Sequence, residues 1–167
     1  MMRTLAGFVS AVSLATLLSP LALAGMQGST FMRKAIEGNL AEIKVGQLAQ
    51  QKGASEGVRR LGAVLERDHS KANQQAIAAA SAAGVTPPTE PGEKERAEYQ
   101  RLAALSGARF DRAFVKDMIK DHEKDIAEYR REAKAGGDEA ATYAKASLPT
   151  LEKHLRLAES LERRPGG

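Results

Sequence analysis

The chain has 167 residues, no cysteine, and 25 basic against 21 acidic side chains, for a formal net charge of +4. Without cysteine there is no disulfide framework and no thiolate metal ligand, so a hydrophobic core must hold the fold. Only 4% of the residues are aromatic and the charges are interspersed, so we expect no nucleic-acid partner, although the high pI mildly favours acidic partners.

Residues 1–24 match an export signal. Arg3 supplies the positive n-region, Leu5 to Leu18 form an apolar segment, and Ala22-Leu23-Ala24 is a small-x-small cleavage pattern. The apolar stretch is nearly long enough to cross a bilayer, so an uncleaved anchor is the alternative. No cysteine follows it, which excludes a lipoprotein. We expect cleavage between Ala24 and Gly25 and a periplasmic or secreted protein without stable membrane insertion.

Residues 25–162 predict one all-α domain, because Ala, Leu, Lys, Glu and Arg dominate and no window alternates with period two. Four long amphipathic helices and a shorter one before the third are expected, at about residues 30–50, 56–83, 93–105, 108–134 and 138–161. Ser55 is a suitable N-cap for the second helix. Pro149 should kink the last helix or mark the end of a short first piece. Residues 163–167 are expected to form a disordered tail.

The lengths of the connections predict the topology. A few residues join the first long helix to the second and the third to the fourth, so each pair should form an antiparallel hairpin. More than twenty residues separate the second and third long helices. This segment can run back along the second helix, which is about 40 Å long at 1.5 Å per residue. We therefore expect a ferritin-like four-helix bundle with a long crossover that contains the short extra helix, since simple up-and-down bundles have short loops.

Three histidines and one glutamate are the candidate site residues. His69, His122 and His154 each lie near the middle of a different expected helix, and Glu42 lies on the first helix. The depths of His69 and His122 are about 20 and 21 Å from a shared end of the bundle, and Glu42 is about 12 Å from an end, at 1.5 Å per residue. His154 is about 24 Å from the opposite end of the bundle. We expect these side chains to approach one layer of the core.

Three imidazoles and a carboxylate are a suitable set of ligands for Zn, Cu(II), Mn or Fe. Small residues near Glu42 would leave room for an ion and its water, and they are Ala35, Gly38, Gly46 and Ala49. Met118, one turn before His122, would favour copper if its thioether points the same way. The metal-free alternative is a polar core in which Glu42 accepts a hydrogen bond from a buried histidine. A further alternative places the histidines on the surface.

Two sequence patterns around the candidate histidines do not indicate further metal ligands. Asp-His-x-Lys occurs at residues 68–71 and 121–124, and we interpret each Asp and Lys as an i,i+3 surface ion pair. Glu66 and His69 form the Glu-x-x-His spacing of di-iron bundles. Leu151 occupies the corresponding position before His154, so a di-iron carboxylate site is not expected.

Six blocks of the sequence, in order, resemble the bacterial domain-of-unknown-function family 4142. They span residues 40–49, 68–73, 84–88, 105–111, 120–124 and 148–155. The resemblance implies an exported protein with a ferritin-like four-helix bundle and implies no activity, because the family is uncharacterised. The family pattern includes Glu42, His69, Asp111, His122 and His154 at matching positions. Asp111 begins the third long helix, and capping that helix would be a sufficient role for it.

The sequence thus predicts a periplasmic bundle that holds a metal ion with His69, His122, His154 and Glu42. Its role would be metal handling or stress protection in the envelope. The alternative is a metal-free structural bundle that binds envelope proteins. A small ferritin-like oxidase is a second alternative, which the missing carboxylates argue against. No substrate is indicated, so we do not expect an enzyme.

Overall fold

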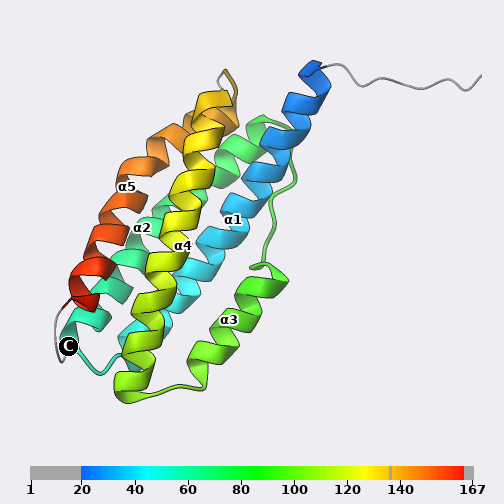
Figure 1. Cartoon of the computed structure of the whole chain (residues 1–167). Helices are drawn as coiled ribbons and strands as arrows, with labels where there is room; N and C mark the ends of the chain where they lie inside the picture. Colours follow the sequence, from blue (N-terminus) through cyan, green and yellow to red (C-terminus); the bar gives the residue numbers. More distant parts are fainter. Residues whose placement is uncertain (1–19, 136, 164–167) are drawn as a thin grey trace, which may run out of the picture.

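Five helices and no strand make up the part of the chain that the structure describes (Figure 1). This computed structural model describes residues 20–135 and 137–163, with side chains from residue 25 onward. The helices are α1 (Pro20–Lys52), α2 (Glu56–Ala82), α3 (Glu93–Ala103), α4 (Gly107–Ala135) and α5 (Glu139–Glu162). The all-α prediction is confirmed. Within the described residues, no helix combines the length and hydropathy that a membrane span requires.

Helix α1 is described from Pro20 onward, so it already includes the ten residues before the expected start at residue 30. The hydroxyls of Ser29 and Thr30 donate to the carbonyls of Gly25 and Met26 inside the helix, so Thr30 does not start it. Residues 1–19 of the predicted export signal lie outside the described residues. Signal cleavage and cellular location therefore stay predictions.

Helix α5 contains Pro149 and continues without interruption to Glu162, so the alternative of a short first piece that ends there is wrong. Proline removes one backbone hydrogen bond, but Pro149 and Lys145, whose carbonyl loses its donor, are both exposed to water. The helix starts at Asp138, whose carboxylate accepts from the backbone N–H of Ala141. Of the predicted tail, only Arg163 is described, and residues 164–167 lie outside the described range.

The connections follow the expected course. Helices α1 and α2 form one antiparallel hairpin and α4 and α5 form another, and the chain between them returns along the bundle through α3 (Figure 1). Helix α3 lies against α1 and α4. Lys44 on α1 forms an ion pair with Glu90 of the returning segment at 2.9 Å, and Arg33 donates to the carbonyl of Thr86 at 3.1 Å. These contacts hold the crossover against α1.

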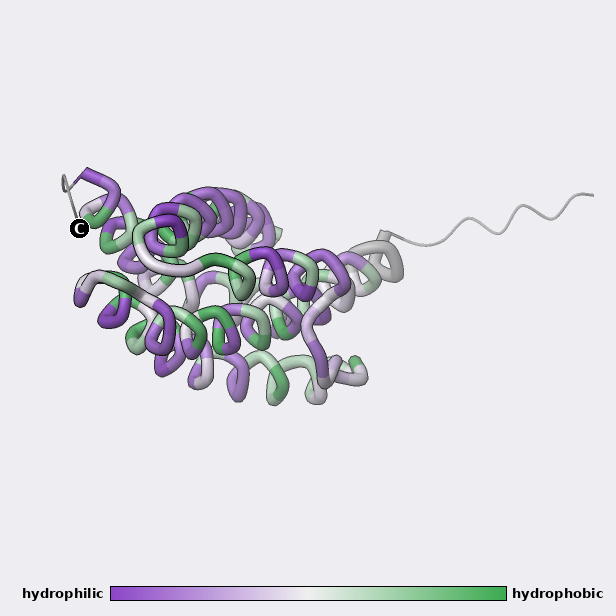
Figure 2. Tube along the Cα trace, turned by 90° about the horizontal axis from the view of Figure 1, so that it is seen from below, coloured by the Kyte–Doolittle hydropathy of each residue, from purple (hydrophilic) through white to green (hydrophobic). Residues whose placement is uncertain are grey.

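Two apolar clusters form the core, and a polar layer separates them. Hydrophilic and hydrophobic residues are mixed along the helices, as Figure 2 shows. On α2, Leu65 belongs to one cluster and Ala76 to the other. The buried polar residues between the clusters are Asn39 and Glu42 on α1, His69 on α2, His122 on α4 and His154 on α5. The layer lies near the middle of the bundle, at the level that the helix lengths predicted.

Helices α1 and α2 touch backbone to backbone at two glycines. A Cβ on Gly46 would lie 2.7 Å from the carbonyl oxygen of Gly62, and a Cβ on Gly62 would lie 2.6 Å from that of Gly46. Gly46 was expected to leave room around Glu42, and the structure uses it for this helix contact instead. Gly38 is different, because a Cβ there would meet no atom within 4 Å.

We expect Gly62→Ala to lower the free energy of unfolding by about 1–3 kcal/mol, because the two helices must move apart to admit a methyl group. Gly38→Ala is the matched control on α1 and should raise stability by about 0.5–1 kcal/mol, since alanine loses less entropy in a helix. Urea unfolding of both variants measures the difference. Equal effects of the two substitutions would contradict the close contact at Gly46 and Gly62.

Candidate metal centre

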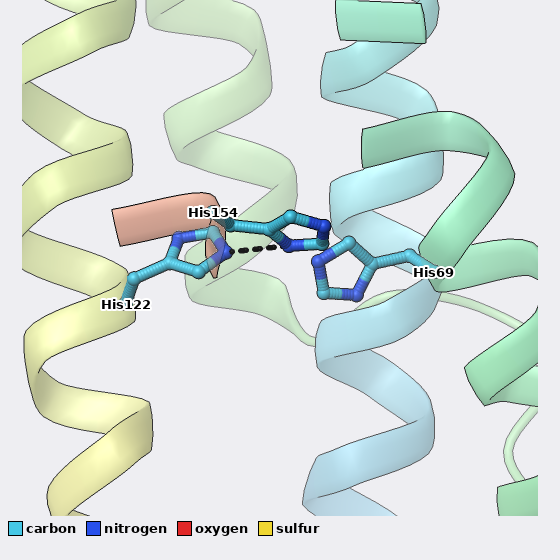
Figure 3. Close-up of side chains that lie close together, drawn as sticks. All are labelled: His69, His122 and His154. Carbon is cyan, nitrogen blue, oxygen red and sulfur yellow. Dashed lines mark hydrogen bonds between the residues drawn. The ribbon is translucent and has the colours of Figure 1, made fainter. Parts of the chain in front are cut away.

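Three imidazole rings from three helices meet in the polar layer (Figure 3). His69, His122 and His154 are buried, with 5%, 2% and 1% of their surface exposed. One nitrogen from each ring can be chosen so that all three lie within 4.8 Å of one another. The ring centres are 5.1 to 5.9 Å apart. Three of the four predicted ligands therefore share one site.

The second nitrogen of each ring is held by an oxygen from the protein. His122 Nδ1 lies 2.9 Å from the carbonyl oxygen of Met118, and His154 Nε2 lies 3.0 Å from a carboxylate oxygen of Asp68. His69 Nδ1 lies 2.9 Å from the side-chain oxygen of Asn39, whose amide nitrogen donates to Tyr143. These oxygens only accept hydrogen bonds, so the ring proton of each neutral histidine lies on the anchored nitrogen.

This arrangement leaves three lone pairs in the interior, on His69 Nε2, His122 Nε2 and His154 Nδ1. His69 Nε2 is buried without a hydrogen-bond partner. His122 Nε2 and His154 Nδ1 are only 3.3 Å apart, as the dashed line in Figure 3 marks. A hydrogen bond between these two nitrogens needs an additional proton on one ring. Two facing lone pairs without a proton repel, and a cation between them removes that repulsion.

Burial and mutual proximity keep the rings uncharged at neutral pH. Burial lowers the pKa of His122 to about 4, and His154 contributes to the shift. Burial and the two neighbouring rings hold the pKa of His69 well below its usual value. Burial also lowers the pKa of His154, although Asp68 acts in the opposite direction. The site therefore offers neutral imidazoles, which is the form that binds metal ions.

The chain matches the family model described as Domain of unknown function (DUF4142) over residues 16–161. It belongs to the DUF4142 family. A solved structure described as a DUF305 fragment from Deinococcus radiodurans shares its fold, with a TM-score of 0.71 and 18% sequence identity. That match covers 83% of this chain and 97% of the solved one. No curated protein matches the chain.

Glu42 of this DUF4142 protein is buried in the polar layer but is not part of the group of histidine ligand atoms. Its Oε2 atom accepts no hydrogen bond. Burial, and then the carboxylates of Asp125 and Asp121, raise its pKa well above the usual value. Coordination of a metal ion by Glu42 stays a prediction.

The thioether of Met118 was considered as a soft metal ligand. The structure instead shows that its backbone carbonyl accepts a hydrogen bond from His122.

Two anchoring residues were missed from the sequence. Asn39 and Asp68 lie on α1 and α2, and the rings that they hold belong to the neighbouring helices α2 and α5. The predicted surface pair of Asp68 and Lys71 is wrong, because Asp68 pairs with Lys153, His154 and Arg67. Partial burial acts against it, but hydrogen bonds from these groups hold the pKa of Asp68 well below its usual value.

The other predicted surface pair is also wrong. Lys124 pairs with Asp125 at 3.4 Å and with Glu128 at 4.0 Å, while Asp121 faces a cavity between α1, α3 and α4. Asp111 does not cap its own helix. Its two carboxylate oxygens accept from the backbone N–H groups of Ala54 and Ser55 at 2.8 Å, which fixes the turn between α1 and α2.

Asp121 should destabilise the fold above pH 6. Burial and the negative charge of Glu98 raise its pKa from 3.8 to about 6, and Lys94 opposes them. Between these values the unfolded chain has released the proton and the folded chain keeps it, so stability falls as the pH rises. We expect Asp121→Asn to raise the free energy of unfolding at pH 7.5 by on the order of 1 kcal/mol, after allowance for solvent screening.

This gain should be largely lost near pH 4, where the folded chain keeps the proton and the unfolded chain is about half protonated. The groups that act on Asp121 from the packed helices are Glu98, Lys94, Asp125 and Asp117. The control is Glu123→Gln on the exposed face of α4, which should change stability by less than about 0.5 kcal/mol. Thermal unfolding at both pH values checks this, and an equal gain at pH 4 and pH 7.5 would contradict it.

Proposed function

We propose that this protein is an exported, ferritin-like helical bundle that binds one transition-metal ion with His69, His122 and His154. It would act in metal handling or stress protection in the cell envelope. The observation that carries the proposal is the convergence of three ring nitrogens whose protons are held elsewhere. The amino-terminal sequence supports export, and the crossover through α3 supports the ferritin-like assignment.

The donor set limits the choice of metal. Neutral imidazole suits zinc, copper and iron, and the absence of thiolates from the sequence disfavours Cu(I). Two nitrogens bonded tetrahedrally at 2.0–2.1 Å lie roughly 3.3–3.4 Å apart, which matches the 3.3 Å between His122 Nε2 and His154 Nδ1. The three ligand nitrogens lie within 4.8 Å of one another, so bringing them to that separation would require a shift of at most about 1.5 Å. Three protein ligands leave a fourth position for water or for a carboxylate such as Glu42.

The anchoring oxygens strengthen this proposal. Histidines that bind metals donate their other N–H to a carboxylate or a carbonyl, which fixes the ring and makes the free nitrogen more basic. Here His154 donates to Asp68 and His122 donates to Met118. Lys153 and Arg67 in turn hold Asp68.

The main alternative is a metal-free core in which a proton takes the place of the ion. His154 would then be an imidazolium paired with Asp68 and would donate to His122, which the 3.3 Å contact permits. The lowered pKa values of both rings oppose it. In that case the bundle would serve as a structural unit or would bind envelope proteins. An oxidase of the di-iron type lacks its carboxylate ligands here.

Metal binding should be measured on protein that carries no histidine tag. We expect one Zn(II) or Co(II) per chain after loading and dialysis, and none in His122→Ala, because two imidazoles hold an ion much more weakly than three. Zinc at a hundredfold excess over its Kd should stabilise the native protein by about 2.7 kcal/mol. Elemental analysis and thermal unfolding give these values. Native protein that retains no Zn, Cu, Mn or Fe would favour the metal-free core.

Half-buried Asp68 and buried Asp111 allow support of the metal to be separated from support of the fold. We expect Asp68→Asn to weaken metal affinity by about 10–100-fold, because it weakens the acceptor of His154. Asp111→Asn is the matched control, since Asp111 holds only the turn between α1 and α2. It should lower thermal stability and leave affinity within about twofold. Competition titration with a chelating dye measures both affinities. An unchanged affinity in Asp68→Asn would mean that His154 is not a ligand.

A further inference from the structure

A cavity of about 290 Å³ lies beside the triad, between α1, α3 and α4. Figure 1 shows α3 running along the outer side of this region. Eight carboxylates and three lysines line the cavity, together with His69. The carboxylates are Glu37, Glu42, Glu95, Glu98, Asp117, Asp121, Asp125 and Glu128. The protein as a whole has a net charge of +4, whereas carboxylates outnumber lysines in the lining of this cavity.

The lining becomes more buried toward the triad. Lys34, Lys94 and Lys124 are exposed at the rim. Asp121 and Asp125 on α4, like Glu98 on α3, are half-buried. Glu42 and His69 are buried. From solvent inward, the cavity is therefore lined first by lysines, then by carboxylates, and finally by the ring of His69 in the candidate metal centre.

The lysines at the rim do not neutralise the interior. Lys94 pairs with Glu98 at 3.3 Å, Lys34 with Glu128 at 3.9 Å, and Lys124 with Asp125 and Glu128. Among the described residues, neither Glu42 nor Asp121 takes part in an ion pair. The deeper carboxylates therefore face one another without a counter-charge.

Two buried atoms in the lining have no partner. Glu42 Oε2 and His69 Nε2 accept no hydrogen bond, and their residues are only 9% and 5% exposed. An unsatisfied polar atom in the interior destabilises the fold unless it gains a partner. Both atoms are electron-pair donors, and a cation that moves along the cavity would meet first the carboxylate and then the ring.

We propose that this acidic cavity is the entrance by which a hydrated divalent transition-metal cation reaches the histidine triad, with Glu42 as the last carboxylate before the rings. The inference depends on the proposed function, since an entrance needs a site behind it. Asp121 and Asp125 attract the cation to the opening between α3 and α4. Glu42 replaces part of its water shell and gives the ion up to the three imidazoles. The lining disfavours anions, because carboxylates outnumber lysines and each lysine is already paired with a carboxylate.

The test is the rate at which Co(II) enters the native protein, followed by stopped-flow absorbance. A cleft lined by one sign of charge raises the association rate of an opposite ion by 10–1000-fold. We expect Asp121→Asn to slow uptake by about tenfold, the low end of that range. Glu42→Gln should also slow uptake, because it replaces the buried carboxyl by an amide, which binds a cation more weakly. The matched control is Glu123→Gln, which makes the same change in net charge on the exposed face of α4. It should leave the rate within about twofold, as expected of a surface charge screened by salt.

The outcomes separate this inference from the proposed function. Slower uptake in the two cavity variants, with the Co(II) spectrum of the native site at saturation, supports the entrance. Equal rates in all three variants would overturn it and leave the triad in place. A changed Co(II) spectrum in Glu42→Gln would make Glu42 a ligand, which also overturns its role in transfer. Native protein that never develops a Co(II) spectrum would end the proposed function and the inference together.

Discussion

Each buried imidazole must place its one N–H on an acceptor, and this constraint determines what the middle of the bundle can do. Two of the three acceptors come from a neighbouring helix, Asn39 on α1 for His69 on α2 and Asp68 on α2 for His154 on α5. The rings therefore join helices as well as facing one another. Turning any ring to hide its lone pair would break an anchoring hydrogen bond. Such a bond is worth about 1.5–3 kcal/mol for the charged acceptor Asp68 and about 0.5–1.5 kcal/mol for the neutral acceptors Asn39 and Met118. The hydrogen bonds of His69 with Asn39 and of His154 with Asp68 therefore do two things: they join neighbouring helices, and they keep the unprotonated ring nitrogens facing one another.

The polar layer is positioned by the apolar clusters on either side of it. Close-packed side chains such as Phe31 and Tyr129 in one cluster, and Phe110 and Phe114 in the other, leave little freedom to slide one helix along its neighbour. The backbone contact of Gly46 with Gly62 fixes the separation of α1 and α2 in the same way. A site built on rigid elements keeps its geometry better than one built on loops. For this reason rings from three helices can stay within bonding reach of one ion.

The sequence predicted the helices, the crossover and the shared layer of histidines, because hydrophobic period and rise per residue depend only on local geometry. It did not predict the start of α1, since Ser29 and Thr30 can satisfy carbonyls inside a helix as readily as they can cap one. It also missed Asp68 as the partner of His154, because their contact joins residues 86 positions apart and depends on how α2 and α5 are rotated. The acidic line of Asp117, Asp121 and Asp125 was visible at helical spacing. Only the position of α3 shows that it faces a cavity.

Net charge alone would therefore misjudge the partners of this protein. A pI near 9.4 favours acidic partners over the molecule as a whole, yet the opening beside the triad carries the opposite sign. At physiological salt, charges farther apart than about 8 Å are largely screened from each other. An approaching ion thus responds to the carboxylates nearest to it and only weakly to lysines elsewhere on the surface. In the proposed entrance, the charges of Asp121 and Asp125 therefore act on an approaching cation more strongly than the overall excess of basic residues does.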